Sequence, residues 1–338
     1  MIKAKKRGNS WHCLVYLGKD RNGKRKYASI TADTKRECEL LAGQRKQGFE
    51  EKEEIDITVS ECIKEYIENK RVVLSPSTVR TYETTLKNNY EVLGYKNIGK
   101  LTDNDIQKWI NNLYLNGVKV KSIKNAKALM YSALKMYGID TNFNINLPQG
   151  YVVKYRVPTD EELQKIIDYF KERNNQNMIV AVYLSAFGTL RRGEICALTS
   201  DDVVGDCVII NKSLVVNEDY QEVIKPPKTN SSNRIVKLPQ FVIDLLPENG
   251  RLVDMTLTAI THAFYKCAND LGLTGMRFHD LRHYSASIMH AIGVPDSYIM
   301  QRGGWSSDNT LKKVYRNTLT DYEDKFSETT VNYFDKFK

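Results

Sequence analysis

The stretch FHDLRHY, residues 278–284, is the part of the chain on which the interpretation of the whole fold depends. It holds His279 and Arg282 in a His-x-x-Arg pattern, followed directly by a second histidine, His283. Each of these residues taken alone is more often structural than catalytic. The stretch becomes informative together with three other segments, because reactive side chains in a fixed order and spacing seldom arise by chance.

These three segments lie on both sides of the stretch. The first is FGTLRRGEI, residues 187–195, and the second is KPPKT, residues 225–229, which is expected to form a β-turn. The third runs from GGWSS, residues 303–307, to LKKVYR, residues 311–316. The four segments supply arginine, lysine, histidine and tyrosine side chains, which are the types that bind phosphate and transfer protons.

In this order the segments resemble the catalytic motifs of the tyrosine recombinase (phage integrase) family, as in integrases of phages and conjugative transposons. The family's first motif has an arginine, here Arg191, before a small residue and a glutamate, here Glu194. Its second motif is His-x-x-Arg, which His279 and Arg282 match. The resemblance extends over nearly the whole chain, and the HDLRH segment with a downstream tyrosine is its most specific part.

The remaining motifs of the family follow the same order. A Gly-His or, less often, Gly-Trp motif is matched by Gly304 and Trp305. The nucleophilic tyrosine of the family lies about nine or ten residues later and is matched by Tyr315. The family's lysine, in a β-hairpin between the first two motifs, is best matched by Lys228, with Lys225 and Lys237 as competitors.

The sequence departs from the family pattern at two places. The usual Thr-Gly-Leu-Arg is here Gly188-Thr189-Leu190-Arg191, which should alter local packing more than chemistry. The usual histidine of the third motif is Trp305. An indole donates one N–H hydrogen bond but moves no proton at neutral pH. Only phosphate stabilisation is therefore expected of Trp305.

The resemblance implies a chemistry that suits these residue types. Exchange of a phosphodiester passes through a phosphorane with extra negative charge, and the forked guanidiniums of Arg191 and Arg282 bind its oxygens better than lysines would. Tyr315 would form a 3′-phosphotyrosine link that keeps the bond energy. No ATP, metal or other cofactor is therefore expected.

Proton transfer and positioning fall to three further residues. A phenol has a pKa near 10, so a base must accept its proton, and the resemblance assigns this role to His279. Lys228, on a hairpin, suits protonation of the departing 5′-oxygen. Glu194 lies three residues after Arg191 and is expected to orient it through a salt bridge.

Other tyrosines and histidines were weighed for the same roles. Tyr322 and Tyr333 lie near Tyr315, but Tyr322 precedes two acidic residues that would repel a phosphate. Tyr315 instead has basic neighbours, Lys312, Lys313 and Arg316. His262 and His290 belong to no motif and are expected to be structural, and the role of His283 stays open.

Residues 1–56 are expected to form an arm-type DNA-binding domain. Residues 1–50 hold thirteen Lys and Arg against five Asp and Glu, which is nearly all of the net charge of +9. Residues 11–17 and 24–30 read as two strands around a turn that ends in Asn-Gly, and a capping box at Thr34 predicts a helix. Lys24, Arg25 and Lys26 are the candidate DNA contacts, because a two-stranded ribbon enters the major groove; a solvated charged hairpin is the alternative.

The rest of the chain divides into a helical core-binding domain, a linker and a catalytic domain. Residues 57–140 show apolar stripes at helical spacing and predict about four helices, with capping boxes or a proline marking their starts. Residues 141–157 lack helical periodicity and are the expected linker. Residues 158–338 contain the four motifs and a C-terminal tail, with a β section around 207–238. The predicted fold class is mainly α with small β-sheets (α+β).

Composition limits what surrounds the protein. The six cysteines form no CxxC pair, so neither disulfides nor a structural metal are expected. No apolar run is long enough to span a membrane, and no secretory signal begins the chain, so a cytoplasmic location on the nucleoid is expected. The expected partners are double-stranded DNA, at core crossover sites and distal arm sites, and DNA-bending or excisionase-like directionality proteins.

Exchange of two duplexes cuts four strands, so a homotetramer is expected. The resemblance implies that the tail from Thr320 to Lys338 passes to a neighbouring protomer; packing of the tail on its own domain is the alternative.

Three rival functions are less consistent with the sequence. A type IB topoisomerase would need no arm-like module, a non-catalytic DNA-binding regulator would not keep the Arg, His, Arg, Tyr set, and a metal-dependent nuclease would need clustered carboxylates.

Overall fold

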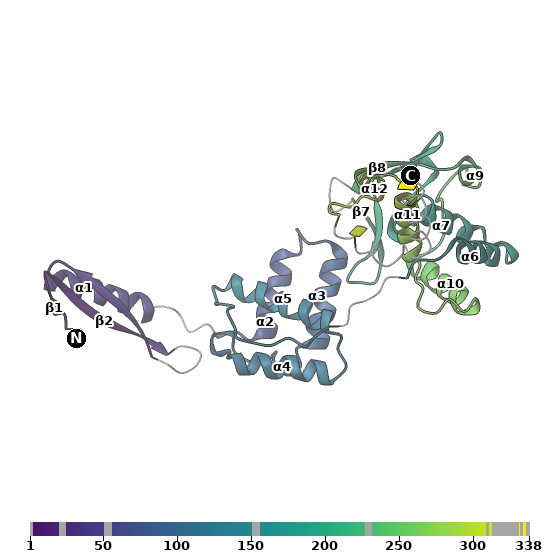
Figure 1. The fold of residues 1–338 in the computed structure, drawn as a ribbon. Coiled ribbons are helices and arrows are strands. Elements are labelled where there is room, and N and C mark those ends of the chain that lie inside the picture. The colour runs from purple at the N-terminus through teal and green to yellow at the C-terminus, as the bar shows by residue number, and fades with distance from the viewer. Residues whose placement is uncertain are drawn as a thin grey trace. The chain divides into compact units, whose positions relative to one another are not determined.

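The computed structural model describes residues 3–19, 25–50, 56–150, 156–226, 232–308 and 311–312, with Val331, Phe334 and Asp335. The chain forms two compact units, residues 1–151 and 152–338. Helices dominate both, and the sheets are small and antiparallel (Figure 1). The predicted fold class, mainly α with small β-sheets, is confirmed.

The N-terminal module is a three-stranded antiparallel sheet with one helix. Its elements are β1 (Lys5–Arg7), β2 (Ser10–Lys19), β3 (Arg25–Ala32) and α1 (Lys35–Glu50). Pairing of β2 with β3 confirms the predicted hairpin, although residues 20–24 of its turn, Lys24 included, lie outside the described residues. The hydroxyl of Thr34 accepts the Glu37 N–H at 3.2 Å, as the capping box predicts.

The alternation of β2 gives this small sheet two different faces. Cys13 and Val15 are buried against Cys38 of α1, whereas Leu14 and Tyr16, which point the other way, are exposed. One face is therefore covered by α1, and the opposite face is open.

Four helices form the second part of the first unit, as predicted. They are α2 (Val59–Lys70), α3 (Pro76–Asn89), α4 (Asp103–Leu115) and α5 (Val120–Met136), with a short 3₁₀ turn η1 (Ile98–Lys100). Capping boxes begin α2 at Thr58 and α4 at Thr102, and Pro76 is the first residue of α3. Local rules of helix initiation therefore account for the boundaries of these helices.

The core of the helical bundle is centred on Trp109. Its indole N–H donates to the carbonyl of Asn89 at 2.6 Å, and its ring stacks on Tyr90 at 5.2 Å. The Tyr90 hydroxyl donates to the carbonyl of Ala126. Two large polar aromatics are buried here because each has a partner for its polar atom.

The start of the predicted linker belongs to the bundle rather than to a free connection. Residues 138–150 contain neither helix nor strand, yet Phe143, Ile145 and Leu147 pack half-buried against the bundle core. These side chains cover an apolar surface of the bundle. The alternating apolar pattern of the segment does not by itself show that such a surface lies next to it. The stretch without periodicity therefore includes a segment that covers the bundle.

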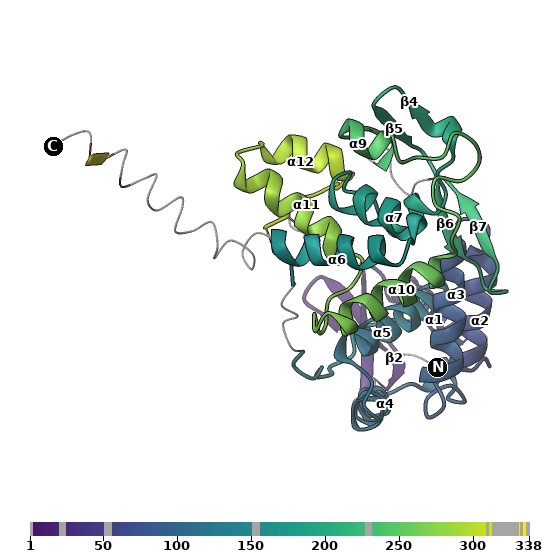
Figure 2. The same ribbon diagram turned by 90° about the vertical axis from the view of Figure 1, so that its right-hand side faces the viewer.

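The second unit combines helices with two small antiparallel sheets (Figure 2). The helices are α6 (Asp160–Glu172), α7 (Gln176–Ala186), α8 (Arg192–Ile195), α9 (Gln240–Ile243), α10 (Leu257–Asp270), α11 (Asp280–Ala291) and α12 (Asp296–Gly303), with a 3₁₀ turn η2 (Ser200–Asp202). Strands β4 (Val203–Val204), β5 (Cys207–Ile210) and β8 (Arg234–Lys237) form one sheet, and β6 (Ser213–Val216) and β7 (Glu222–Lys225) form the other. The predicted β section is confirmed.

Helix α7 is the centre of this unit. All nine residues from Met178 to Ala186 are buried, because α7 packs against α6, α10 and α11. A helix that is apolar on every side must lie inside the protein. Its C-terminal end leads directly into the first motif, so the motif starts from a helix that is buried along most of its length. No helix in the described ranges is long and apolar enough to cross a membrane.

Candidate active site

The first motif forms a tight corner between α7 and α8. Arg191 has extended backbone angles and precedes α8, and the Glu194 carboxylate accepts the Arg191 backbone N–H at 2.8 Å. The same carboxylate accepts Nη1 of the Arg191 side chain at 2.7 Å. The predicted salt bridge is thus present in the structure. Glu194 also caps the short helix, so backbone and guanidinium of Arg191 are fixed by one carboxylate.

A third arginine, Arg234 at the start of β8, completes this arrangement. Its Nη2 donates to Oε2 of Glu194 at 2.8 Å and its Nη1 to Oε1 at 3.0 Å. Burial alone would raise the pKa of Glu194, but the hydrogen bonds and charge of Arg234, with the charge of Arg191, hold it at about 2. Sequence reasoning missed Arg234, since it lies in no matched motif and is 40 residues from Glu194.

Arg282, on the first turns of α11, is fully buried. Its Nη1 donates to the carbonyl of Thr189 and its Nη2 to that of Gly303. The guanidinium carbon lies 4.0 Å from the centre of the Trp305 ring, a cation–π contact. Burial, and then the charge of Arg191, lower the pKa of Arg282. The Nε of Arg282 has no hydrogen-bond partner among the described residues.

The end of α12 is held by all three arginines. The carbonyls of Arg302, Gly303 and Gly304 are consecutive, and they accept hydrogen bonds from Arg234 (2.7 Å), Arg282 and Arg191 (2.8 Å) respectively. The last carbonyls of a helix lack partners within the helix and carry its negative dipole end. Arginine side chains supply both the missing donors and the opposite charge. The segment that leads toward Tyr315 therefore starts from a fixed point.

Trp305 follows directly and packs over the same turn. Gly303 has no Cβ, and a Cβ there would overlap the Trp305 ring. Gly304 ends α12 in the left-handed conformation, with φ of 63°. Two successive glycines thus let the indole fold back onto Arg282. Trp305 of the third motif and Arg282 of the second motif are in contact as a result.

His279 and His283 lie together at the start of α11. Their rings meet edge to face with centres 4.9 Å apart. His279 is exposed and His283 is buried, yet the surrounding protein desolvates both. This desolvation, and then the charges of His283 and Arg282, lower the pKa of His279 to about 4. Desolvation, followed by the charges of Arg282 and Arg277, lowers the pKa of His283 to about 4 as well.

The two remaining motif residues, Lys228 and Tyr315, lie outside the described residues, as do Tyr322 and Tyr333. The structure does place one competitor of Lys228. The ammonium of Lys237 is 2.6 Å from Asp206, and this hydrogen bond raises its pKa. Lys237 is therefore paired on the surface, and Lys225, the other competitor, is the last residue of β7.

The candidate DNA contacts of the N-terminal module are partly visible. Arg25 and Lys26 are exposed on β3, and Lys24 is not described. By strand alternation Arg25 shares the open face of the sheet with Tyr16 and Tyr27, which are paired across the strands with ring centres 5.5 Å apart. This face combines positive charge with aromatic rings.

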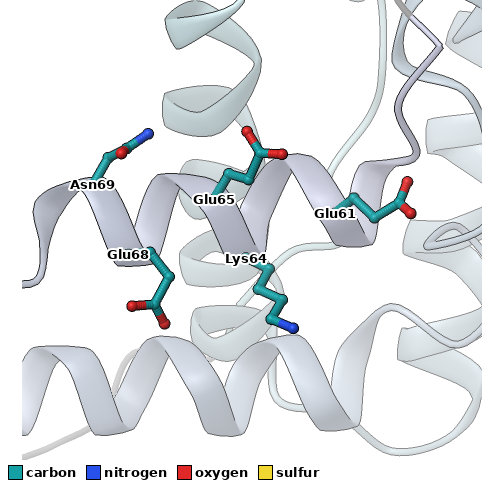
Figure 3. A pocket seen from close by; sticks show the side chains of 5 residues that line it. All are labelled: Glu61, Lys64, Glu65, Glu68 and Asn69. Carbon is teal, nitrogen blue, oxygen red and sulfur yellow. The ribbon is translucent and has the colours of Figure 1, made fainter.

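Helices α2 and α5 of the bundle differ in the charge of their exposed residues. Helix α2 carries Glu61, Glu65 and Glu68 around a shallow pocket that Lys64 and Asn69 also line (Figure 3). Figure 3 shows Glu65 and Asn69 leaving the helix on one side and Lys64 and Glu68 on the other. Helix α5 instead has exposed lysines along its N-terminal half, at positions 119, 121 and 124. Duplex DNA is a poor match for the acidic surface and a good match for the basic one.

Comparison with known proteins agrees with this geometry. The family model described as phage integrase family matches residues 156–321, and that of the phage integrase N-terminal SAM-like domain matches residues 58–114. The chain is 24% identical to a tyrosine recombinase XerC-like protein of Caldanaerobacter subterraneus subsp. tengcongensis, over 96% of both chains.

Two solved structures share the fold. The Tn1549 transposon integrase in complex with transposon right end DNA superposes with a TM-score of 0.68 at 16% identity, covering 81% of this chain and 100% of that one. A lambda integrase tetramer bound to a Holliday junction gives 0.61 at 15% identity, covering 93% and 97%.

The turn before Arg191 generates a prediction about stability. Thr189 is buried in the left-handed region with φ of 58°, and its hydroxyl has no partner in the described part of the chain. Gly188 cannot exchange places with it, because a Cβ there would lie 2.7 Å from the carbonyl oxygen of Leu184. The strained backbone and the unpaired buried hydroxyl each destabilise the folded state by about 1–3 kcal/mol, and replacing Thr189 by Gly removes both. The replacement also loses some side-chain packing and makes the unfolded chain more flexible, which offsets part of the gain.

We expect Thr189→Gly to stabilise the second unit by about 1 kcal/mol. Urea unfolding followed by Trp305 fluorescence measures this, with Trp11 and Trp109 changed to Phe because they lie in the first unit. The matched control is Thr258→Gly, on the exposed side of α10, which is expected to destabilise. A lower urea midpoint for Thr189→Gly than for the parent would contradict the prediction.

The histidine pair generates a prediction about protonation. A free histidine has a pKa near 6.5, so at pH 5.5 the unfolded chain binds protons that folded His279 and His283 do not. Stability from both residues is thus complete above about pH 6.5 and is lost as pH falls toward 4. NMR titration of ring carbons, assigned with His279→Gln and His283→Gln, should show both rings neutral at pH 5.5. Half-protonation of either ring near pH 6.5 would refute this.

Proposed function

Since this chain belongs to the phage integrase (tyrosine recombinase) family and is a site-specific DNA recombinase, we propose that Tyr315 is its nucleophile and that Arg191 and Arg282 hold the scissile phosphate. The observation that carries this proposal is the convergence of both arginines on the end of α12, about ten residues before Tyr315. This convergence supports the proposal that the two motifs and Tyr315 share one site.

The charge of the cluster suits the reaction. Arg191, Arg234 and Arg282 with Glu194 leave two positive charges, and a pentavalent phosphorane carries two negative ones. The side chain of Arg191 is 34% exposed and can reach a phosphate from the surface. The Nε of Arg282 is a buried donor without a partner in the described part of the chain, and such donors are commonly completed by a ligand.

In the proposed cleavage step, one bond to phosphorus forms and another breaks. The Tyr315 oxygen attacks phosphorus, its proton passes to His279, and a 3′-phosphotyrosine bond forms. The bond between phosphorus and the 5′-oxygen breaks, and Lys228 protonates that oxygen. With its pKa lowered to about 4, the imidazole of His279 is neutral at pH 7 and can accept a hydrogen bond from the phenol. The same shift makes it a weaker base, so its proposed role rests on the match to the His-x-x-Arg motif and not on the shift. Attack by a different 5′-hydroxyl reverses the step, so no ATP is consumed.

Different surfaces would bind different parts of the DNA. The open face of the N-terminal sheet, with Arg25, Tyr16 and Tyr27, is the proposed arm-site surface. Helix α5, with its exposed lysines, is the proposed core-site surface of the bundle. One named relative in the structural comparison is a tetramer bound to a Holliday junction. A homotetramer is proposed here as well, because two duplexes present four strands.

The tail from Thr320 to Lys338 is proposed to pass to a neighbouring protomer in that tetramer. Nearly all of it lies outside the described residues; Val331 and Phe334, which are described, are exposed. Apolar side chains that stay exposed suit a contact with another copy. DNA-bending and directionality proteins are proposed as further partners.

The nucleophile is tested with a nicked suicide substrate that carries the core crossover site of the mobile element that encodes this protein. Tyr315→Phe is expected to bind this DNA and to form no covalent complex, because the attacking oxygen is missing. The matched controls are Tyr322→Phe and Tyr333→Phe, which are expected to form the complex. All reactions contain EDTA, which removes the divalent metal that a metal-dependent nuclease needs for activity. A covalent band from Tyr315→Phe would disprove the assignment.

The arm surface is tested on the full chain by footprinting along the end of the element. Arg25→Glu is expected to weaken protection of the flanking repeats, and to lower the salt slope of binding by about 1, since one phosphate contact is lost. Protection of the crossover site should not change. The control is Arg36→Glu, which makes the same charge change on an exposed part of α1. Equal effects of both variants would show that only net charge matters.

A further inference from the structure

Arg234 is the charged residue of the cluster that no catalytic motif includes. Its side chain is 2% exposed, and each of its three nitrogens has a partner: both Nη atoms bind Glu194, Nη1 also binds the carbonyl of Ser232, and Nε binds the carbonyl of Arg302. A guanidinium so enclosed has no surface to offer to DNA. Its contribution to the reaction must therefore pass through the groups that it holds.

The first of these groups is Glu194. Oε1 accepts hydrogen bonds from both Arg191 and Arg234, whereas among the described residues Arg234 is the one side chain that donates to Oε2. Besides its backbone N–H, Arg191 consequently gives Glu194 a single side-chain nitrogen, Nη1, and uses Nη2 for the carbonyl of Gly304. Without Arg234, a buried carboxylate would draw in both nitrogens of Arg191, since arginine and carboxylate favour a two-point contact.

The second group is the end of α12. Arg234 holds the carbonyl of Arg302, one residue before the carbonyl that Arg282 holds and two before that of Arg191. Arg302 adds to the same attachment, because its Nη2 donates to the carbonyls of Phe187 and Lys237. The turn that carries Trp305 is therefore fixed to β8 through Arg234 as well as to the two phosphate-binding arginines.

We propose that Arg234 is a positioning residue for DNA cleavage: by occupying Glu194 it limits that carboxylate to one nitrogen of the Arg191 guanidinium, so that the remaining N–H donors of Arg191 can bind the scissile phosphate, and it fixes the turn before Trp305 without touching DNA. This rests on the proposed roles of Arg191 and Tyr315. A third arginine that contacted DNA would contribute to affinity and to salt dependence. A positioning arginine contributes to the rate of cleavage at saturating DNA.

The test compares Arg234→Lys with Arg251→Lys on the suicide substrate. Arg251 is the matched control, an arginine of the same unit that donates to the carbonyls of Cys196 and Met255. For Arg234→Lys, the charge stays but the fork is lost, so we expect cleavage at saturating DNA to fall about tenfold to a hundredfold. The Kd for core DNA should change less than about threefold, with an unchanged salt slope.

Glu194→Gln and the double variant Arg234→Lys/Glu194→Gln show whether Arg234 acts through Glu194. If it does, the double variant is at most about threefold slower than the slower single variant, because residues that act as a unit are not additive. The double variant also removes the buried negative charge of Glu194. It therefore still tests whether Arg234 acts through Glu194 if Arg234→Lys alone fails to bind DNA.

Wild-type cleavage by Arg234→Lys, a salt slope lowered by about 1, or multiplicative losses in the double variant would each overturn the proposal. Failure of the proposed function looks different. In that case Tyr315→Phe still forms the covalent complex, whatever Arg234→Lys does.

Discussion

The buried carboxylate of Glu194 is the constraint on which the catalytic unit depends. A charge taken out of water is expensive unless it is paired and fully hydrogen-bonded. Glu194 meets this condition with the guanidiniums of Arg191 and Arg234 and with a backbone N–H, and its pKa is accordingly held at about 2. It stays ionised at any pH at which the protein would act. Three arginines can gather in one place because this carboxylate offsets part of their repulsion.

The consequence is a site built largely on backbone carbonyls. Arg191, Arg234 and Arg282 each hold one carbonyl at the end of α12, so the geometry depends on where that helix stops. Gly304 sets this point with its left-handed conformation. A shift of the helix end by one residue would present different carbonyls and would carry Trp305 off Arg282. Local helix termination and long-range charge pairing thus specify the same arrangement.

Sequence reasoning was sufficient where the physics is local. The capping boxes at Thr58 and Thr159, the proline that starts α3 and the contact between Arg191 and Glu194 all join residues three or fewer positions apart. It was insufficient where partners are distant. Arg234 begins an ordinary short strand, and nothing near it shows that its partner is Glu194. Strand β1 and the packing of Phe143 on the bundle were likewise invisible, because both depend on surfaces formed elsewhere.

Trp305 shows how one departure redistributes roles within the site. An indole cannot move protons, but its ring face can stabilise a buried cation, and here it covers Arg282 at 4.0 Å. That contact stabilises an arginine whose Nε has no partner among the residues that the structure describes, and whose pKa is lowered by burial. Under the proposed mechanism, proton transfer therefore falls to side chains outside the arginine cluster. His279, three residues before Arg282 in the same motif, is the proposed acceptor, and a lysine is the proposed donor.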